Sequence, residues 1–338
     1  MLRPARFDHL PTPLTRDALR AAGVTDDQLR GPAWQRMSQG LYLPAGADPT
    51  APLQRILVSG TRLPTDAAIG GWGAARCLGV VECDGVGIDG RTLLDVPACV
   101  PGSGRRRQAG GVQIWADRLP TSDVTETGPL RVTAGPRTCF DGIRHAASTV
   151  EAVVFADQLT HAGLVTIAEM ADYIAARASS RGVRQARRAL ELCDPMARNG
   201  WETRTRMVWV LDAGLPRPRC NPPLFDLDGN LLGFPDLLDV VAGTVVEYDG
   251  GGHRKAIRHS RDNVREELFE DHGLVVCRAT REDHEYVADL STRMTRARDR
   301  GVRRDRRRDR WTLDPPPDWG SMGDDAALAV ALLAVEPD

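Results

Sequence analysis

Hydrophobic residues follow helical spacing in some segments of the chain and form continuous or alternating runs in others. Residues 255–273 are mostly polar and place apolar residues at positions i, i+7 and i+11, which predicts a helix that ends at Gly273. The apolar run at residues 274–280 predicts a buried strand, and residues 281–294 predict a last helix. Alternation of such elements predicts a mixed α/β fold.

The segment before this helix predicts two adjacent strands. Residues 237–241 and 244–248 are rich in β-branched and apolar residues, and Ala242 and Gly243 between them predict a two-residue turn. Residues 201–216 predict a helix, and the sequence D-L-D-G-N at residues 226–230 predicts a hairpin turn. Together these elements predict an α/β unit of about 90 residues around a small sheet.

The N-terminal segment, residues 13–46, predicts two short helices followed by a strand. Thr15 is placed to cap the first helix, and Gly23 to end it. The sequence T-D-D-Q at residues 25–28 is a capping box that opens the second helix, and Pro32 either breaks that helix or precedes it. Two helices and a β wing predict a winged helix-turn-helix.

The middle of the chain, residues 49–195, predicts a mixed α/β domain. Strands are expected within residues 91–101 and 110–119, and helices are expected within four other segments: 70–80, 137–148, 150–163 and 166–179. The polar residues of these helices show no spacing typical of a metal site or a catalytic group, so we expect them to be satisfied by local partners: Asp141, His145, Asp157 and His161.

The net charge of −2 gives the chain as a whole no attraction for nucleic acid. The charge is unevenly distributed, because residues 293–310 hold ten Arg and three Asp, whereas residues 311–338 hold six acidic residues and no basic residue. We expect the Arg-rich segment to be a solvated, partly helical extension that adds phosphate affinity. The acidic tail either folds back on that segment or is disordered.

The cysteine pattern and the N-terminus predict a cytoplasmic protein. The seven Cys form no C-x-x-C pair, which argues against a disulfide framework and a structural zinc site. No secretory signal is visible at the N-terminus, and the longest apolar run, residues 326–335, is too short to cross a membrane.

Three carboxylates are expected to lie together at the end of the predicted hairpin. Side chains alternate along a strand, so Glu247 and Asp249 point to the same face. An antiparallel neighbour brings Asp236 beside Glu247. Carboxylates that are packed together require a cation or raised pKa values, and hard oxygen ligands favour Mg²⁺ or Mn²⁺.

These residues form the ordered pattern P-D-x10-E-x-D-G-x-x-H, which resembles the very-short-patch-repair-like branch of the PD-(D/E)XK endonucleases. The resemblance covers residues 201–285 and implies a restriction-endonuclease-like core. It implies that Asp236 and Glu247 hold the metal, that His253 is a general base or acid, and that Glu202 reaches a second ion or orients a water. Asp249, between Glu247 and His253, is counted with the catalytic residues as a third ligand or as the partner of His253.

Asp249 also marks a departure from the family pattern, because it replaces the motif lysine. Lys255 is the only lysine of the chain and is one candidate to replace the missing cation. Arg254 and Arg265 are the other candidates. Lys255 and Arg265 are also expected to contact nucleic acid.

The N-terminal segment resembles the DNA-binding domain of abortive-infection-type antitoxins, in the order helix, G-V-T, helix, then G-L-Y-L-P. In that resemblance Arg30 and Arg36 are the expected nucleic-acid contacts of the second helix. The alternative is that this small module docks a protein. The combined resemblance implies a multi-domain α/β protein with four segments: 1–48, 49–195, 196–291 and 292–338.

Three functions remain open from the sequence. The first is a metal-dependent DNA endonuclease in defence or DNA processing, and the second is a non-catalytic antitoxin-like regulator with a degenerate nuclease domain. The third is a nuclease that acts on RNA. The expected partners are DNA, including the protein's own promoter, and a partner protein or a second copy of the chain, with no membrane involved.

Overall fold

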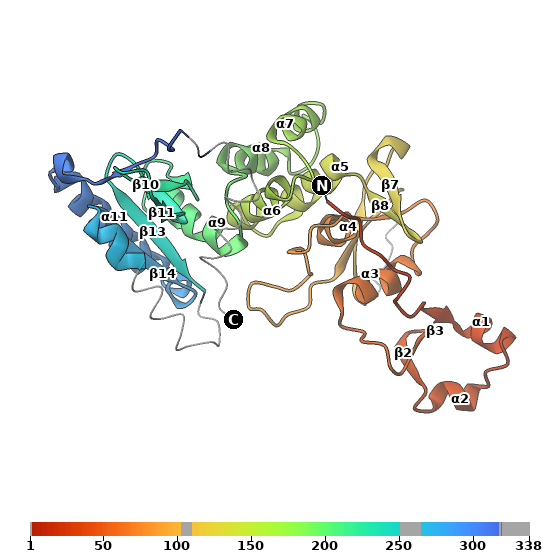
Figure 1. The fold of residues 1–338 in the computed structure, drawn as a ribbon. Coiled ribbons are helices and arrows are strands. Elements are labelled where there is room, and N and C mark those ends of the chain that lie inside the picture. The colour runs from red at the N-terminus through yellow and green to blue at the C-terminus, as the bar shows by residue number, and fades with distance from the viewer. Residues whose placement is uncertain (1, 103–109, 251–264, 318, 320–338) are drawn as a thin grey trace. The chain divides into compact units, whose positions relative to one another are not determined.

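A computed structural model describes residues 2–102, 110–250, 265–317 and 319. The chain divides into two compact units, Met1–Cys193 and Asp194–Asp338, and both contain helices and sheets (Figure 1). The prediction of a mixed α/β fold is therefore confirmed. Within the described ranges, no helix is long and apolar enough to cross a membrane.

The first unit begins with two short helices and a small antiparallel sheet of order β1-β3-β2. These elements are β1 (Leu14–Thr15), α1 (Arg16–Ala21), α2 (Asp26–Arg30), β2 (Trp34–Ser38) and β3 (Leu41–Pro44). Thr15 caps α1, and both bonds of the predicted capping box between Thr25 and Gln28 are formed. Leu19, Leu29 and Tyr42 form a small core between the helices and the sheet.

The second helix, α2, ends before Pro32, so it is shorter than a helix that continued through this residue. It ends at Arg30, after which Gly31 is extended and Pro32 supplies no N–H to continue a helix. Residues 34–38 instead form β2, in which Arg36 pairs with Tyr42 of β3. The prediction that Arg36 lies on the second helix is therefore wrong.

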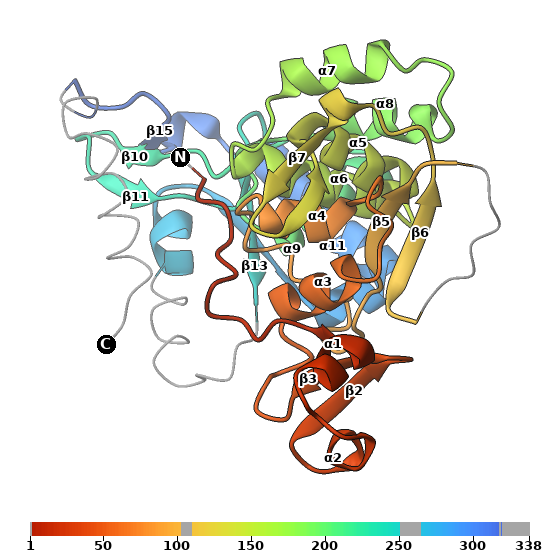
Figure 2. The ribbon, with the colours of Figure 1, turned by 90° about the vertical axis from the view of Figure 1, so that its right-hand side faces the viewer.

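The rest of the first unit is built on a five-stranded sheet of order β6-β5-β4-β8-β7. Its strands are β4 (Ala68–Ile69), β5 (Val96–Val100), β6 (Val112–Ala116), β7 (Val124–Thr127) and β8 (Leu130–Thr133). Its helices are α3 (Pro52–Gly60), α4 (Gly71–Cys77), α5 (Gly135–His145), α6 (Thr149–His161), α7 (Ile167–Ala175), α8 (Val183–Leu192) and a 3-10 turn η1 (Thr121–Asp123). The helices α5 to α8 pack on one another (Figure 2).

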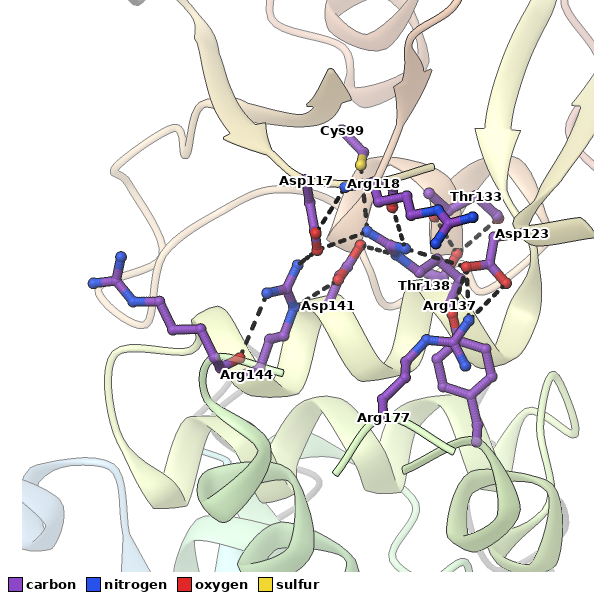
Figure 3. A network of polar contacts seen from close by, with 12 residues as sticks. Cys99, Asp117, Arg118, Asp123, Thr133, Arg137, Thr138, Asp141, Arg144 and Arg177 are labelled. Carbon is purple, nitrogen blue, oxygen red and sulfur yellow. Dashed lines mark hydrogen bonds and ion pairs between the residues drawn. The ribbon is translucent and has the colours of Figure 1, made fainter. Parts of the chain in front are cut away.

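A buried arginine joins the sheet of this unit to its helices. Arg137 of α5 is only 3% exposed, and its guanidinium contacts Asp141 at 2.6 Å and Asp117 and Asp123 at 3.1 Å (Figure 3). Arg144 pairs with Asp117 and Asp141, and a further arginine, Arg177, pairs with Asp123. Three carboxylates thus meet three guanidinium groups, which leaves the network balanced in charge.

Two of the polar residues expected to be locally satisfied have clear partners. Asp141 is fully buried between Arg137 and Arg144. His145 stacks on Trp115 with ring centroids 4.3 Å apart, and burial together with Arg144 lowers the pKa of His145 to about 4. Both observations agree with a structural interpretation of this region.

The second unit contains a four-stranded sheet of order β14-β13-β12-β9 and a three-stranded sheet of order β11-β10-β15. Its strands are β9 (Arg219–Cys220), β10 (Leu224–Asp226), β11 (Leu231–Gly233), β12 (Leu237–Asp239), β13 (Thr244–Asp249), β14 (Val275–Thr280) and β15 (Trp311–Thr312). Its helical elements are α9 (Gly200–Met207), a π-helical turn η2 (Val208–Asp212), residues 265–271, the 3-10 turns η3 (Glu282–Glu285) and η4 (Arg306–Arg308), and α11 (Val287–Arg303).

The predicted strands and the turn at residues 226–230 are present, but the connection between β12 and β13 is longer than expected. Asp239 pairs with Thr244, so residues 240–243 form a four-residue connection rather than a two-residue turn. Gly243 adopts a φ of 60°, which glycine tolerates.

The Arg-rich segment is more integrated than a solvated extension. The helix α11 runs through residue 291, where the sequence placed a domain boundary, and it buries Met294, Ala297 and Gly301. After it, β15 pairs with β10. Residues 292–312 are therefore part of the second unit.

We expect Asp141→Ala to destabilise the chain by about 3–5 kcal/mol, because it removes the fully buried one of the two carboxylates that Arg137 and Arg144 share. The matched control Asp172→Ala changes an exposed carboxylate of α7 and should shift stability by less than about 0.5 kcal/mol. Urea denaturation of both variants checks the difference. Equal midpoints would show that the network contributes no stability.

Candidate functional site

The pairing of the central strand β13 determines which carboxylates lie close together. It pairs antiparallel with β12 and parallel with β14, so that Val246 lies opposite Leu237. Val245 packs in the core that contains Phe269, whereas Val246 packs in the core on the other face. By alternation Glu247 and Asp249 lie on the Val245 side, which agrees with the prediction.

Asp236 immediately precedes β12 and lies beside the end of β13. The Tyr248 N–H donates a hydrogen bond of 2.7 Å to its Oδ2. This bond ties Asp236 to the strand that carries Glu247, so the structure brings together the two predicted metal ligands.

Glu202 comes from the first turn of α9 and is only 5% exposed. Asn199 caps this helix by accepting hydrogen bonds from the N–H groups of Trp201 and Glu202. The Arg198 N–H donates to Glu202 Oε2 at 2.8 Å. The residues that cap α9 therefore also fix the position of the Glu202 carboxylate.

Asn221 links the Glu202 carboxylate to the backbone of Asp236 and was not predicted from the sequence. Its N–H donates to the Asp236 carbonyl at 3.1 Å, and its Nδ2 donates to Glu202 Oε2 at 2.8 Å. It has a φ of 46°, a left-handed conformation that asparagine tolerates better than most residues. Among the described residues its buried Oδ1 accepts no hydrogen bond.

The predicted carboxylates share one cavity of about 550 Å³ in the second unit. The acidic residues that line it are Glu202, Asp236, Glu247, Asp249 and Glu266. Three arginines also line it: Arg198, Arg265 and Arg278. Trp201 and Tyr248 form one wall, with ring centroids 5.4 Å apart and nearly parallel planes. The cavity therefore combines anionic, cationic and flat apolar surfaces.

Three of the carboxylates bind protons more tightly than usual. Burial raises the pKa of Glu247 to about 8, with a further contribution from Asp236 that Arg265 opposes. Burial and the nearby Asp236 raise the pKa of Glu202 to about 7. Burial also raises the pKa of Asp236, although the Tyr248 N–H opposes the shift. Burial therefore disfavours the charged forms of these three groups more than the facing arginines and hydrogen-bond donors favour them.

Arg265 is the described cation closest to the predicted metal ligands. Its Nη2 lies 3.4 Å from both Glu247 carboxylate oxygens, and it donates to the Phe234 carbonyl. Arg278 lies next to Glu247 on the neighbouring strand and pairs with Glu266 at 2.8 Å. Of the replacements considered for the motif lysine, Arg265 is within the described residues, and it lines the cavity.

The remaining predicted residues lie either outside the described ranges or in the first unit. His253 and Lys255 lie outside the described residues, as do Arg254 and the segment that follows. In the first unit, Arg30 is exposed and pairs with Asp27. Arg36 is also exposed and donates to the Ser38 carbonyl.

Within the described ranges, no group of three or more His, Cys, Asp or Glu side chains is arranged to hold a metal ion. The chain matches none of the protein-family models, curated proteins or solved structures with which it was compared. Function is therefore inferred from the residues that form the cavity.

The protein without metal should become less stable as the pH rises from about 7 to about 8.5. A carboxyl whose pKa is higher in the folded state contributes stability below its unfolded value of 4.5, and this contribution is lost as the pH rises through about 7 for Glu202 and about 8 for Glu247. His145 and His284 have lowered pKa values and titrate mainly below this range. Urea denaturation in EDTA at the two pH values measures the loss.

The variant Glu247→Gln should show a smaller loss over the same range, because it removes the group with the pKa of about 8. Parallel stability profiles for Glu247→Gln and the wild type would contradict the assignment of the pH dependence to Glu247.

The left-handed conformation of Asn221 can be tested with two substitutions that both remove its side-chain hydrogen bond to Glu202. We expect Asn221→Ala to be less stable than Asn221→Gly by about 1 kcal/mol, since only glycine adopts this conformation without strain. Urea denaturation compares them. If the alanine variant is equally stable, the backbone at residue 221 is not strained by a Cβ atom.

Proposed function

We propose that the second unit is a Mg²⁺- or Mn²⁺-dependent endonuclease that hydrolyses phosphodiester bonds in DNA. The observation that carries the proposal is the convergence of Glu202, Asp236 and Glu247 on one cavity that also holds arginines. Three separate segments supply the carboxylates, and burial raises the pKa of each. A divalent cation would stabilise the charged forms of these carboxylates, and it would also bind the oxygens of a phosphodiester.

The donor set suits Mg²⁺, although it does not form a cage of three ligands. Mg²⁺ retains several waters in proteins and is usually held by one or two carboxylates together with the substrate phosphate. Asp236 and Glu247 are the two that would hold it, together with the carbonyl near Tyr248. When bound, the metal lowers the pKa of a water and neutralises charge on the phosphoryl oxygens.

The other residues of the cavity have roles that follow from their chemistry. Arg265 and Arg278 are donors for the phosphate oxygens, and Arg265 supplies the positive charge that Asp249 cannot give at the motif-lysine position. Glu202, with a pKa of about 7, can hold or release a proton near neutral pH. Asn221 keeps Glu202 and Asp236 in register with each other.

The N-terminal elements support a DNA-binding role for the first unit. Two helices followed by a β-hairpin, closed by β1, have the order of a winged helix-turn-helix, as in antitoxin-like DNA-binding domains. Arg30 and Arg36 would then contact DNA from α2 and from the hairpin. Such a module would guide the nuclease to its substrate or to the protein's own promoter.

We expect Asp236→Ala and Glu247→Ala to reduce metal-dependent plasmid nicking by more than about 100-fold, since loss of even an outer-shell partner of a metal costs about 10–100-fold. Nicking is measured on gels with Mg²⁺ or Mn²⁺, and DNA binding of the variants by fluorescence anisotropy. Binding should survive. No cleavage of any DNA form by the wild type would overturn the proposal, and cleavage of RNA alone would reassign the substrate.

The second candidate is a non-catalytic regulator, and the ion pair between Arg265 and Glu247 favours it. This arginine partly neutralises Glu247 without a metal, and Asp249 replaces the motif lysine. A regulator would bind DNA upstream of its own gene with the same affinity after Glu247→Ala, and neither protein would nick it. The nicking assay therefore separates the two candidates.

A further inference from the structure

The ten arginines of residues 293–310 differ in their contacts, and two groups of them stand out. Five of them donate to carbonyls or carboxylates of the second unit: Arg293, Arg298, Arg304, Arg306 and Arg310. Arg298, for example, lies 2.8 Å from the nearly buried carboxylate of Asp239. These five hold α11 and the segment after it against the sheet.

A different group points to solvent from α11. Arg296, Arg300 and Arg303 are exposed, and none makes an ion pair or hydrogen bond with another residue in the described part of the chain. Their spacing of four and three residues places them on one face of the helix. The buried residues of α11 lie on a different face of the helix.

The position of this face relates it to the cavity. Arg293, which is three residues before Arg296, donates to the carbonyl of Arg278, and Arg278 lines the cavity. The helix packs against β14 in the core that contains Val246, so it lies on the face of the sheet opposite Glu247 and begins seven residues after the end of β14. A chain that leaves the cavity around the carboxyl ends of β13 and β14 would therefore reach this face from the N-terminal end of α11.

The dimensions of the face suit a phosphodiester backbone. At about 1.5 Å per residue, the three arginines span about 10 Å of helix, and one DNA strand presents a phosphate about every 3.4 Å along its axis. Asp299 is the only acidic residue of α11 between Arg296 and Arg303, so the face keeps a net positive charge. Charge complementarity therefore favours a linear polyanion.

We propose that Arg296, Arg300 and Arg303 form a phosphate-binding surface for the nucleic-acid strand that leaves the cavity. The proposal rests on the nuclease function for the identity of the ligand. Arginines contact phosphates through their forked donors without reading the bases, so the surface should add affinity for any sequence.

The test measures binding of full-length protein to a labelled duplex in EDTA over a series of KCl concentrations. Replacing Arg296, Arg300 and Arg303 together with Gln should reduce the slope of log K against log salt by about 0.9 per lost phosphate contact, thus by about 2 to 3. The unfolding midpoint of this variant should match the wild type, because the three side chains are exposed. Binding in EDTA does not depend on cleavage, so a failed nicking assay would not affect this result.

Two controls separate the surface from charge and from folding. The triple change Arg184, Arg187 and Arg188→Gln removes the same charge from the exposed face of α8 and should leave the slope unchanged. The single change Arg298→Gln should lower the unfolding midpoint and also leave the slope unchanged.

Equal slopes for the wild type and the Arg296, Arg300 and Arg303 variant would overturn the proposal, as would an equal reduction in the α8 control. Vesicles of phosphatidylserine and phosphatidylcholine test a membrane as the ligand. If the variant loses vesicle binding and keeps the wild-type slope on DNA, the surface is a membrane contact and the proposal is wrong.

Discussion

The register of β13 between β12 and β14 is the constraint on which the candidate site depends. Because side chains alternate along a strand, this register places Val245 in one core, Val246 in the other and Glu247 in the cavity. A slip of one residue would exchange Glu247 with Tyr248 and bury a carboxylate where an aromatic ring now packs. Both cores therefore stabilise the arrangement of the site, although they lie outside it.

Two clusters of buried carboxylates in this chain are neutralised in different ways. Around Arg137, three carboxylates meet three arginines, and the charges balance. In the cavity of the second unit, Glu202 and Glu247 have pKa values near or above neutrality because burial outweighs the arginines that face them. The same residue types thus form a charge-balanced structural support in one unit and, in the other, a site whose carboxyl groups are costly to ionise. This contrast, rather than the presence of acidic residues, distinguishes the candidate site.

Local rules explain which parts of the site could be predicted from the sequence. Strand alternation and an antiparallel neighbour are enough to bring together Asp236, Glu247 and Asp249. Asn221 could not be found in this way. Its role depends on its left-handed backbone conformation and on Glu202 of α9, which lies nineteen residues earlier in the chain. The strand at residues 34–38 was missed because the capping box fixes where α2 begins but not where it ends, and pairing with β3 decided the rest.

The contacts of the individual arginines of α11 could not be predicted from the sequence either. Composition treats the Arg-rich segment as one cationic extension, but the structure shows that neighbouring arginines have opposite roles. Arg298 faces the buried carboxylate of Asp239, whereas Arg296 and Arg300, two positions away on either side, face solvent. A rotation of 200° about the helix axis for two residues is enough to separate an internal ion pair from an exposed charge. The net charge of a segment therefore gives an upper limit on its affinity for phosphates, and helical packing decides how much of that charge remains available.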